Sequence, residues 1–234
     1  LIKKSKSQCK KTIVSIFINK PQFERMDDFK KYPRIISKDI KILKKLKINY
    51  LYLPKHREIY PKGVNKKIKI ASFGKKLCGK NRPGHFEAIA DVIERFIKII
   101  NPNKIYLGKK DFQQLKILEH FISKKFRNIK VVGCKTIREN NGIACSSRNY
   151  LLSPREKKIA SEIYRFLKEN KASIIKKKYS LKLIRKKIID TGAKKIDYIK
   201  LLNINRLIKP YKKNIKYKIF IAYYLGTTRL IDNI

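Results

Sequence analysis

Three polar segments of this chain contain residue types that can bind phosphate groups. They are residues 19–23 (NKPQF), residues 108–114 (GKKDFQQ) and residues 145–149 (CSSRN). Lysine and arginine can neutralise phosphate charge, while serine hydroxyls and glutamine amides can donate hydrogen bonds to phosphate or hydroxyl oxygens. The residue types alone therefore favour a nucleotide-binding protein.

Each polar segment also has a purely structural interpretation, which the residue types leave open. Asp111 can be only the N-cap of a following helix, and Gln114 only a solvated residue of its first turn. The serines of residues 145–149 fit an ordinary polar turn. Gln22 can be a loop amide, and His85 a helix-entry residue with a satisfied hydrogen bond.

The first half of the chain alternates strand and helix patterns. We expect strands at residues 13–18, 49–53, 104–107 and 129–132, with helices between them, one of which is capped by Ser37. The first of these runs (IVSIFI) is apolar and β-branched, which is typical of a strand buried on both faces. The alternation predicts an α/β fold with a parallel sheet. Because ligands of such sheets bind beyond the carboxyl ends of the strands, the first two polar segments lie where a ligand is expected.

The pattern changes near Cys134. Residues 153–156 (SPRE) form a capping box with proline at the first helical position, which predicts the start of a helix. We therefore predict two domains, an α/β domain over residues 1–134 and a smaller α+β domain over residues 135–234. In the second domain we expect a lysine-rich connector at 168–178, a helix at 181–189 and strands at 198–202, 217–225 and 229–232.

The composition predicts a globular protein of the cytoplasm. A chain of 234 residues that is 43% hydrophobic can bury a core. Its apolar stretches are too short to span a bilayer, so we expect no membrane partner. The four cysteines lie far apart and fit neither a disulfide framework nor a zinc site, so we expect reduced thiols and no metal-ligating residues.

The net charge of +44 allows two interpretations. A nucleic-acid-binding protein uses such charge to displace counterions from phosphates, and it usually gathers the charge on one face or in an arm. The lysines of this chain are scattered over every region, which favours a compositional drift. We therefore expect only non-specific adsorption to nucleic acid at low salt.

An ordered series of motifs resembles the pantothenate synthetase family over residues 1–234. The motifs are residues 14–19 with 22–23, Asp28 with 32–34 (YPR), 58–61 (EIYP), 82–86 (RPGHF), Gly108 with 110–114 (KDFQQ), 138–139 (RE), Gly142 with Ala144, 146–149 (SSRN) and 229–233 (RLIDN). The resemblance implies a Rossmann-like nucleotide- and pantoate-binding domain over residues 1–134 and a C-terminal lid domain over residues 135–234.

The sequence departs from the family at several positions. Family members begin with a strand and a loop bearing a His-x-Gly-His motif, which this sequence lacks. We therefore expect a fragment whose sheet has a gap between the strands at 13–18 and 104–107, and direct pairing of those two strands would contradict this. Lys109 stands where the family has an acidic residue, and Cys145 stands where it has methionine.

The resemblance implies that the chain joins pantoate to β-alanine with ATP, through a pantoyl adenylate, releasing AMP and pyrophosphate. The implied catalytic residues are Lys110, Ser146, Ser147 and Arg148. The implied ATP-binding residues are Gly108, Lys110, Asp111, Ile137, Cys145, Ser146, Ser147 and Arg148. Gln22 and Gln114 would bind pantoate, Mg²⁺ would accompany ATP, and the chain would form a homodimer. Two alternatives are an inactive remnant of this enzyme and a basic nucleic-acid-binding protein.

Overall fold

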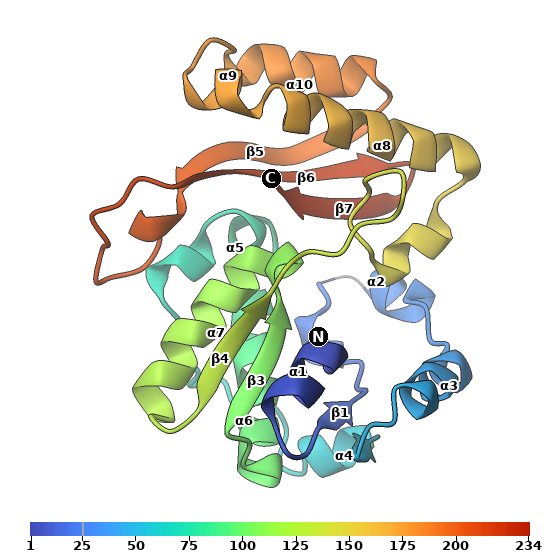
Figure 1. Cartoon of the computed structure of the whole chain (residues 1–234), viewed down its shortest axis with the longest axis vertical. Coiled ribbons are helices and arrows are strands. Elements are labelled where there is room, and N and C mark those ends of the chain that lie inside the picture. Colours follow the sequence, from blue (N-terminus) through green and yellow to red (C-terminus); the bar gives the residue numbers. More distant parts are fainter. Residues whose placement is uncertain (25) are drawn as a thin grey trace. The chain divides into compact units, whose positions relative to one another are not determined.

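The chain is described by a computed structural model that covers residues 1–24 and 26–234. It divides into two compact units, drawn in Figure 1. The first comprises Leu1–Gly108 and Gln114–Cys134, and the second comprises Lys109–Gln113 and Lys135–Ile234. The short segment Lys109–Gln113 therefore belongs to the second unit, although both of its neighbours in the chain belong to the first.

The first unit contains two parallel strand pairs. Strand β1 (Ile13–Ser15) pairs with β2 (Tyr50–Tyr52), and β3 (Lys104–Gly108) pairs with β4 (Lys130–Cys134). The parallel α/β arrangement that we expected from the alternating pattern is confirmed. In the described residues no ladder joins β1 to β3, so the pairing that would have contradicted the expected gap is not found.

The prediction that residues 13–18 form a strand buried on both faces is wrong. Strand β1 has only three residues, and the side chains of Ile13 and Ser15 are exposed. Within the described sheet β1 pairs with β2 alone, so a second neighbouring strand does not shield it. Ser37 does not cap its helix either, because α3 (Ile36–Lys45) begins one residue earlier with Ile35 at the N-cap.

Helices α6 (His85–Ile100) and α7 (Phe112–Lys125) are the two longest of the first half of the chain. Gly84 precedes α6 with a φ of +77°, a left-handed conformation that glycine adopts without a steric cost. The remaining short helices of this half are α1 (Ile2–Gln8), η1 (Lys20–Gln22), α2 (Met26–Lys31), α4 (His56–Ile59), η2 (Ser72–Lys75), α5 (Cys78–Asn81) and η3 (Lys109–Asp111).

The second unit is built on an antiparallel sheet in the order β5 (Lys195–Asn203), β6 (Tyr217–Leu225), β7 (Thr228–Asn233). Helices α8 (Pro154–Glu169), α9 (Lys171–Ile175) and α10 (Leu181–Asp190) lie together on one side of it (Figure 1). Their apolar side chains form one core with the sheet. The unit also contains the short helices η4 (Ser147–Leu151) and η5 (Ile204–Arg206), in addition to η3.

The predicted capping box is present at the start of α8. Ser153 Oγ accepts a hydrogen bond from the backbone N–H of Glu156 (3.2 Å), and Glu156 Oε2 accepts one from the N–H of Ser153 (2.8 Å). The lysine-rich stretch 168–178, which we expected to be a connector, is partly helical, because α8 extends to Glu169 and α9 follows. None of the helices in the described chain is long and apolar enough to cross a membrane.

Candidate active site

The loop after β1 carries Gln22, the first of the two expected pantoate ligands, at the end of η1. The side chain of Asn19 anchors this loop and is only 3% exposed. Its Nδ2 donates to the carbonyl oxygen of Ala88 (3.1 Å) and lies 3.4 Å from Gln22 Oε1, and its Oδ1 accepts a 2.7 Å hydrogen bond from the hydroxyl of Tyr60. Asn19 therefore orients the amide of Gln22.

The backbone of Gln22 is held from the other side by the segment that begins α6. Its carbonyl oxygen accepts hydrogen bonds from Arg82 NH2 (3.0 Å) and from His85 Nδ1 (2.8 Å). Because a carbonyl can only accept, Nδ1 of His85 carries the proton, and Nε2 is left to accept from Arg82 NH1 at 3.1 Å. Both ring nitrogens of His85 are thus satisfied, as the structural interpretation of this residue predicts.

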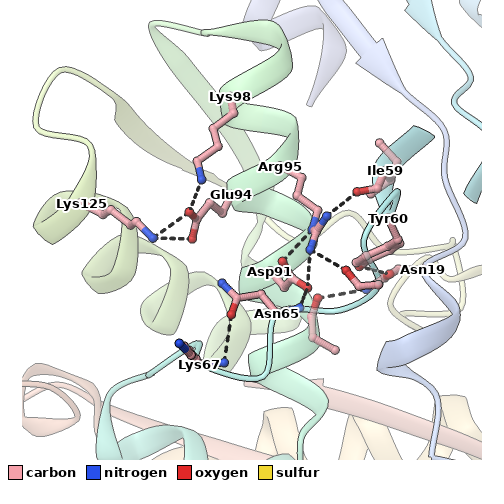
Figure 2. A network of polar contacts seen from close by, with 12 residues as sticks. Asn19, Ile59, Tyr60, Asn65, Lys67, Asp91, Glu94, Arg95, Lys98 and Lys125 are labelled. Atoms are coloured by element: carbon pink, nitrogen blue, oxygen red, sulfur yellow. Dashed lines mark hydrogen bonds and ion pairs between the residues drawn. The ribbon is translucent and has the colours of Figure 1, made fainter. Parts of the chain in front are cut away.

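A buried polar network, which includes Asp91 and Arg95, packs against Tyr60 (Figure 2). Asp91, which is 3% exposed, accepts from Arg95 Nε (2.7 Å) and from the backbone N–H of Asn65 (2.9 Å). The guanidinium of Arg95 also donates to the carbonyl of Ile59 (2.6 Å), and its Cζ lies 4.5 Å from the centroid of the Tyr60 ring. Burial, with the charge of Asp91 adding to it, raises the pKa of Tyr60 to about 12, so its hydroxyl remains a donor at neutral pH.

A second buried carboxylate, Glu94, lies one turn along α6 (Figure 2). It is 4% exposed and bonds Lys125 Nζ through both oxygens at 2.7 Å and Lys98 Nζ at 2.7 Å. Burial disfavours its charged form, but the hydrogen bonds from the two lysines outweigh this and lower the pKa of the carboxyl. One carboxylate thereby pairs with two cations and ties α6 to the end of α7.

Gln114, the second expected pantoate ligand, lies half-buried in the first turn of α7. It belongs to the same unit as Gln22. Gly108 ends β3, and apart from its two neighbours in the chain no described residue has an atom within 4 Å of the point where a side chain on it would begin. The backbone of Gly108 therefore has open space beside it.

The turn η3 carries Lys110 and Asp111, both expected to bind ATP. Lys110 Nζ lies 3.6 Å from Asp111 Oδ1, and the two side chains are 20% and 45% exposed. Asn233, the last residue of β7, donates from Nδ2 to the carbonyl oxygens of Lys109 (2.9 Å) and Lys110 (2.7 Å). The structure thus fixes this turn on the antiparallel sheet of the second unit.

A hairpin over residues 137–145 brings two further expected ATP ligands together. The backbone N–H of Cys145 donates to the carbonyl of Ile137 at 2.9 Å, and both side chains are exposed. Arg138 lies beside Ile137 and makes a bidentate ion pair with Asp232 of β7 at 2.6 and 3.0 Å. The guanidinium also lies 4.0 Å from the centroid of the Tyr164 ring. The hairpin is therefore anchored to β7 and to α8.

The hairpin leads directly into the serine-arginine turn. Ser146 Oγ accepts from the backbone N–H of Arg148 at 3.3 Å and so caps η4, which begins at Ser147. Asn149 is 4% exposed and donates to Glu139 Oε1 (2.6 Å) and to the carbonyl of Ala144 (3.1 Å). These contacts are those of an ordinary polar turn, which is the structural interpretation of this segment. Asn149 holds the turn on the hairpin.

Sequence reasoning missed the residues that hold these segments in place. Tyr60 and Asn233 stand within quoted motifs, but no role was assigned to either. The pair Asp91 and Arg95 had an available signal, because opposite charges four residues apart on a helix can pair. No group of three or more histidine, cysteine, aspartate or glutamate side chains suited to a metal ion occurs in residues 1–24 and 26–234.

Comparison with known proteins gives a consistent result. A family model described as pantoate-beta-alanine ligase matches residues 1–234. The pantothenate synthetase of Caldicellulosiruptor saccharolyticus is 37% identical over 238 residues, which cover 100% of this chain and 85% of that protein. That of Francisella tularensis subsp. mediasiatica is 39% identical over 237 residues, with 100% and 82% covered.

Solved structures agree with the sequence comparisons. A crystal structure of pantoate-beta-alanine ligase from Francisella tularensis, complexed with beta-gamma ATP and beta-alanine, matches with a TM-score of 0.85 and 36% identity. The match covers 100% of this chain and 82% of that one. The pantothenate synthetase of Thermus thermophilus matches with a TM-score of 0.87 and 27% identity, with 100% and 86% covered.

Proposed function

Because this chain belongs to the pantoate-β-alanine ligase family, it is a ligase that joins pantoate to β-alanine, and we propose that it does so through a pantoyl adenylate. ATP is the co-substrate, in keeping with the related Francisella enzyme that was crystallised with a form of ATP and β-alanine. The observation that carries the proposal is the family match over all 234 residues, which includes every implied site residue.

The proposed reaction has two steps. In the first, a carboxylate oxygen of pantoate attacks the α-phosphorus of ATP, and the bond to pyrophosphate breaks. In the second, the amine of β-alanine attacks the acyl carbon, AMP leaves with the electron pair of the carbon–oxygen bond, and the nitrogen loses a proton. The task of the protein is to position three reactants and to neutralise phosphate charge.

The phosphate-binding groups of the proposal come from the second unit. Lys110 and Arg148 would counter the charge of the phosphates, and Ser146 and Ser147 would donate hydrogen bonds to the same oxygens. Asp111 would hold the ribose or the nearby loop. Gly108, Ile137 and Cys145 complete the proposed ATP contacts.

Gln22 and Gln114 of the first unit would bind pantoate. A neutral amide suits this ligand because it can donate to a carboxylate and also accept from a hydroxyl. The contacts of Gln22 with Asn19, Arg82 and His85 support this role, since they fix both the side-chain oxygen and the backbone of the residue.

The proposed reaction also assigns a role to each domain and to Mg²⁺. Residues 1–134 would serve as the nucleotide- and pantoate-binding domain and residues 135–234 as a lid. Mg²⁺ would enter with ATP and be held through phosphate oxygens and water. The protein would act as a homodimer in the cytoplasm and bind nucleic acid only non-specifically.

The test is pantoate-dependent AMP formation. It should be measured on this chain and on the same chain preceded by the His-x-Gly-His segment of a family member, each with and without Lys110→Ala. We expect the extended chain to form AMP only when pantoate is present and Lys110→Ala to reduce the rate by about 100-fold or more. No pantoate-dependent AMP from either form, or RNA binding that survives moderate salt, would contradict the proposal.

A further inference from the structure

We infer that Asn233 is a positioning residue for the ATP-binding lysine, acting through the backbone of η3. The inference rests on the proposed role of Lys110. Asn233 is 4% exposed, and its Nδ2 donates to two successive carbonyl oxygens, those of Lys109 (2.9 Å) and Lys110 (2.7 Å). Two bonds to neighbouring carbonyls constrain the orientation of the turn more than a single bond would.

The amide of Asn233 can have only one orientation. If it were flipped, its oxygen would face two carbonyl oxygens, and acceptors cannot bond one another. In the observed orientation Oδ1 is buried and has no hydrogen-bond partner in the described structure. An unpaired buried acceptor is unfavourable, so an apolar side chain of the same size would suit the site better if packing were its only function. We therefore attribute the presence of an amide at this position to the two hydrogen bonds that it donates.

Asn233 is itself held firmly enough to act as a clamp. Its backbone N–H donates to Asp232 Oδ1 at 2.7 Å, and the carboxylate of Asp232 forms the bidentate pair with Arg138. In the sheet, Asn233 lies opposite Phe220 of β6. Because the end of β7 is held in place, the two hydrogen bonds from Asn233 also hold η3 in place.

Packing around η3 is supplied by other residues. Phe112 directly follows the turn and is 5% exposed, and its ring meets that of Phe220 edge to face with centroids 5.8 Å apart. The aromatic pair holds the segment 109–113 against the sheet, while Asn233 fixes the direction of the turn. Loss of the amide should therefore misdirect Lys110 without detaching the segment. A displacement of about 1 Å in a catalytic group is enough to cost about 100-fold in rate.

The test compares Asn233→Leu, which removes both donors and keeps the branching and the number of side-chain heavy atoms, with Leu230→Ala as the matched control. Leu230 is a buried residue of the same strand that packs in the core shared with α8, α9 and α10, so we expect its replacement to destabilise β7 without removing the bonds to η3. We expect Asn233→Leu to raise the KM for ATP about 10- to 100-fold and leave the KM for β-alanine unchanged. Leu230→Ala should lower the melting temperature at least as much and leave the KM for ATP within about twofold.

Hydrogen exchange adds a readout that needs no activity. Without ATP, the backbone amides of residues 109–114 should exchange faster in Asn233→Leu than in Leu230→Ala. Equal exchange in the two variants, or equal KM values for ATP, would overturn the inference. Lys110→Ala distinguishes the proposed role of Lys110 in binding ATP from the inferred role of Asn233 in positioning it. If Lys110→Ala changes neither the rate of AMP formation nor the KM for ATP, the proposed function of the turn fails, whereas an effect of Lys110→Ala without one of Asn233→Leu refutes only the role of Asn233.

Discussion

Replacing Tyr60 by phenylalanine removes one hydroxyl from the network behind the proposed pantoate site. That hydroxyl donates a 2.7 Å hydrogen bond to Asn19 Oδ1, on a residue that is 3% exposed. The phenylalanine ring keeps the contacts of the tyrosine ring, including its place beside the guanidinium of Arg95. The change therefore isolates the effect of one buried hydrogen bond.

The expected loss of stability follows from the acceptor that is left unpaired. A buried acceptor without its partner costs about 1–3 kcal/mol, and Asn19 keeps its two Nδ2 contacts, so we expect a loss of about 1.5 kcal/mol. Because those contacts orient the amide of Gln22, the KM for pantoate should also rise, by about three- to tenfold. The pKa of Tyr60 is about 12, so neither effect should change between pH 6 and 9.

Urea unfolding and steady-state kinetics with varied pantoate measure the two effects. Tyr50→Phe is the matched control, since Tyr50 is exposed and, among the described residues, its hydroxyl receives a single 3.4 Å contact, from Lys11. An unfolding free energy for Tyr60→Phe that equals that of Tyr50→Phe would refute the energetic argument. An unchanged KM for pantoate would show that the network does not reach Gln22.

Three further changes have definite expected outcomes. Asp91→Ala leaves the guanidinium of Arg95 without its carboxylate and should cost about 3 kcal/mol in urea unfolding, while Asp91→Leu combined with Arg95→Met should recover part of this. Burial, with nearby Lys171 contributing, lowers the pKa of Lys218 from 10.5 to about 8. Between pH 8 and 10.5 the folded chain therefore binds fewer protons than the unfolded chain. The free energy of unfolding should rise with pH across that window. Lys218→Met should abolish that rise and add about 1 kcal/mol at pH 7, as followed by unfolding at pH 7, 9 and 11. Ser153→Ala removes the cap of α8 and should cost about 1 kcal/mol, measured by the same method at pH 7.

Local sequence signals predicted the parts of the fold that depend on neighbouring residues. The capping box at Ser153 and the strands near 104–107 and 129–132 were located within two residues, because apolar runs and cap chemistry act over a few positions. The exposure of Ile13 could not be read in this way. An apolar run shows that a strand is suited to burial, but it does not show whether another strand lies beside it.

Local sequence patterns could not predict which residues position the proposed site. Asn233 binds carbonyls 123 and 124 positions away, and Tyr60 binds Asn19 across 41 positions. Such contacts depend on the assembled fold. The role assigned to Cys145 and Ile137 came from resemblance alone, and their direct backbone hydrogen bond became visible only in three dimensions.

The carboxylate of Glu94, shared by two lysines, has a consequence for the solution conditions that this protein requires. Glu94 carries one negative charge and pairs with two lysines, so even this cluster keeps a net positive charge. With 61 basic and 17 acidic residues, most of the basic side chains of the chain have no acidic partner. Dissolved anions such as phosphate or sulfate must then screen the remaining repulsion. Purification in buffer of low ionic strength is therefore expected to weaken the folded state, and a multivalent anion to restore it.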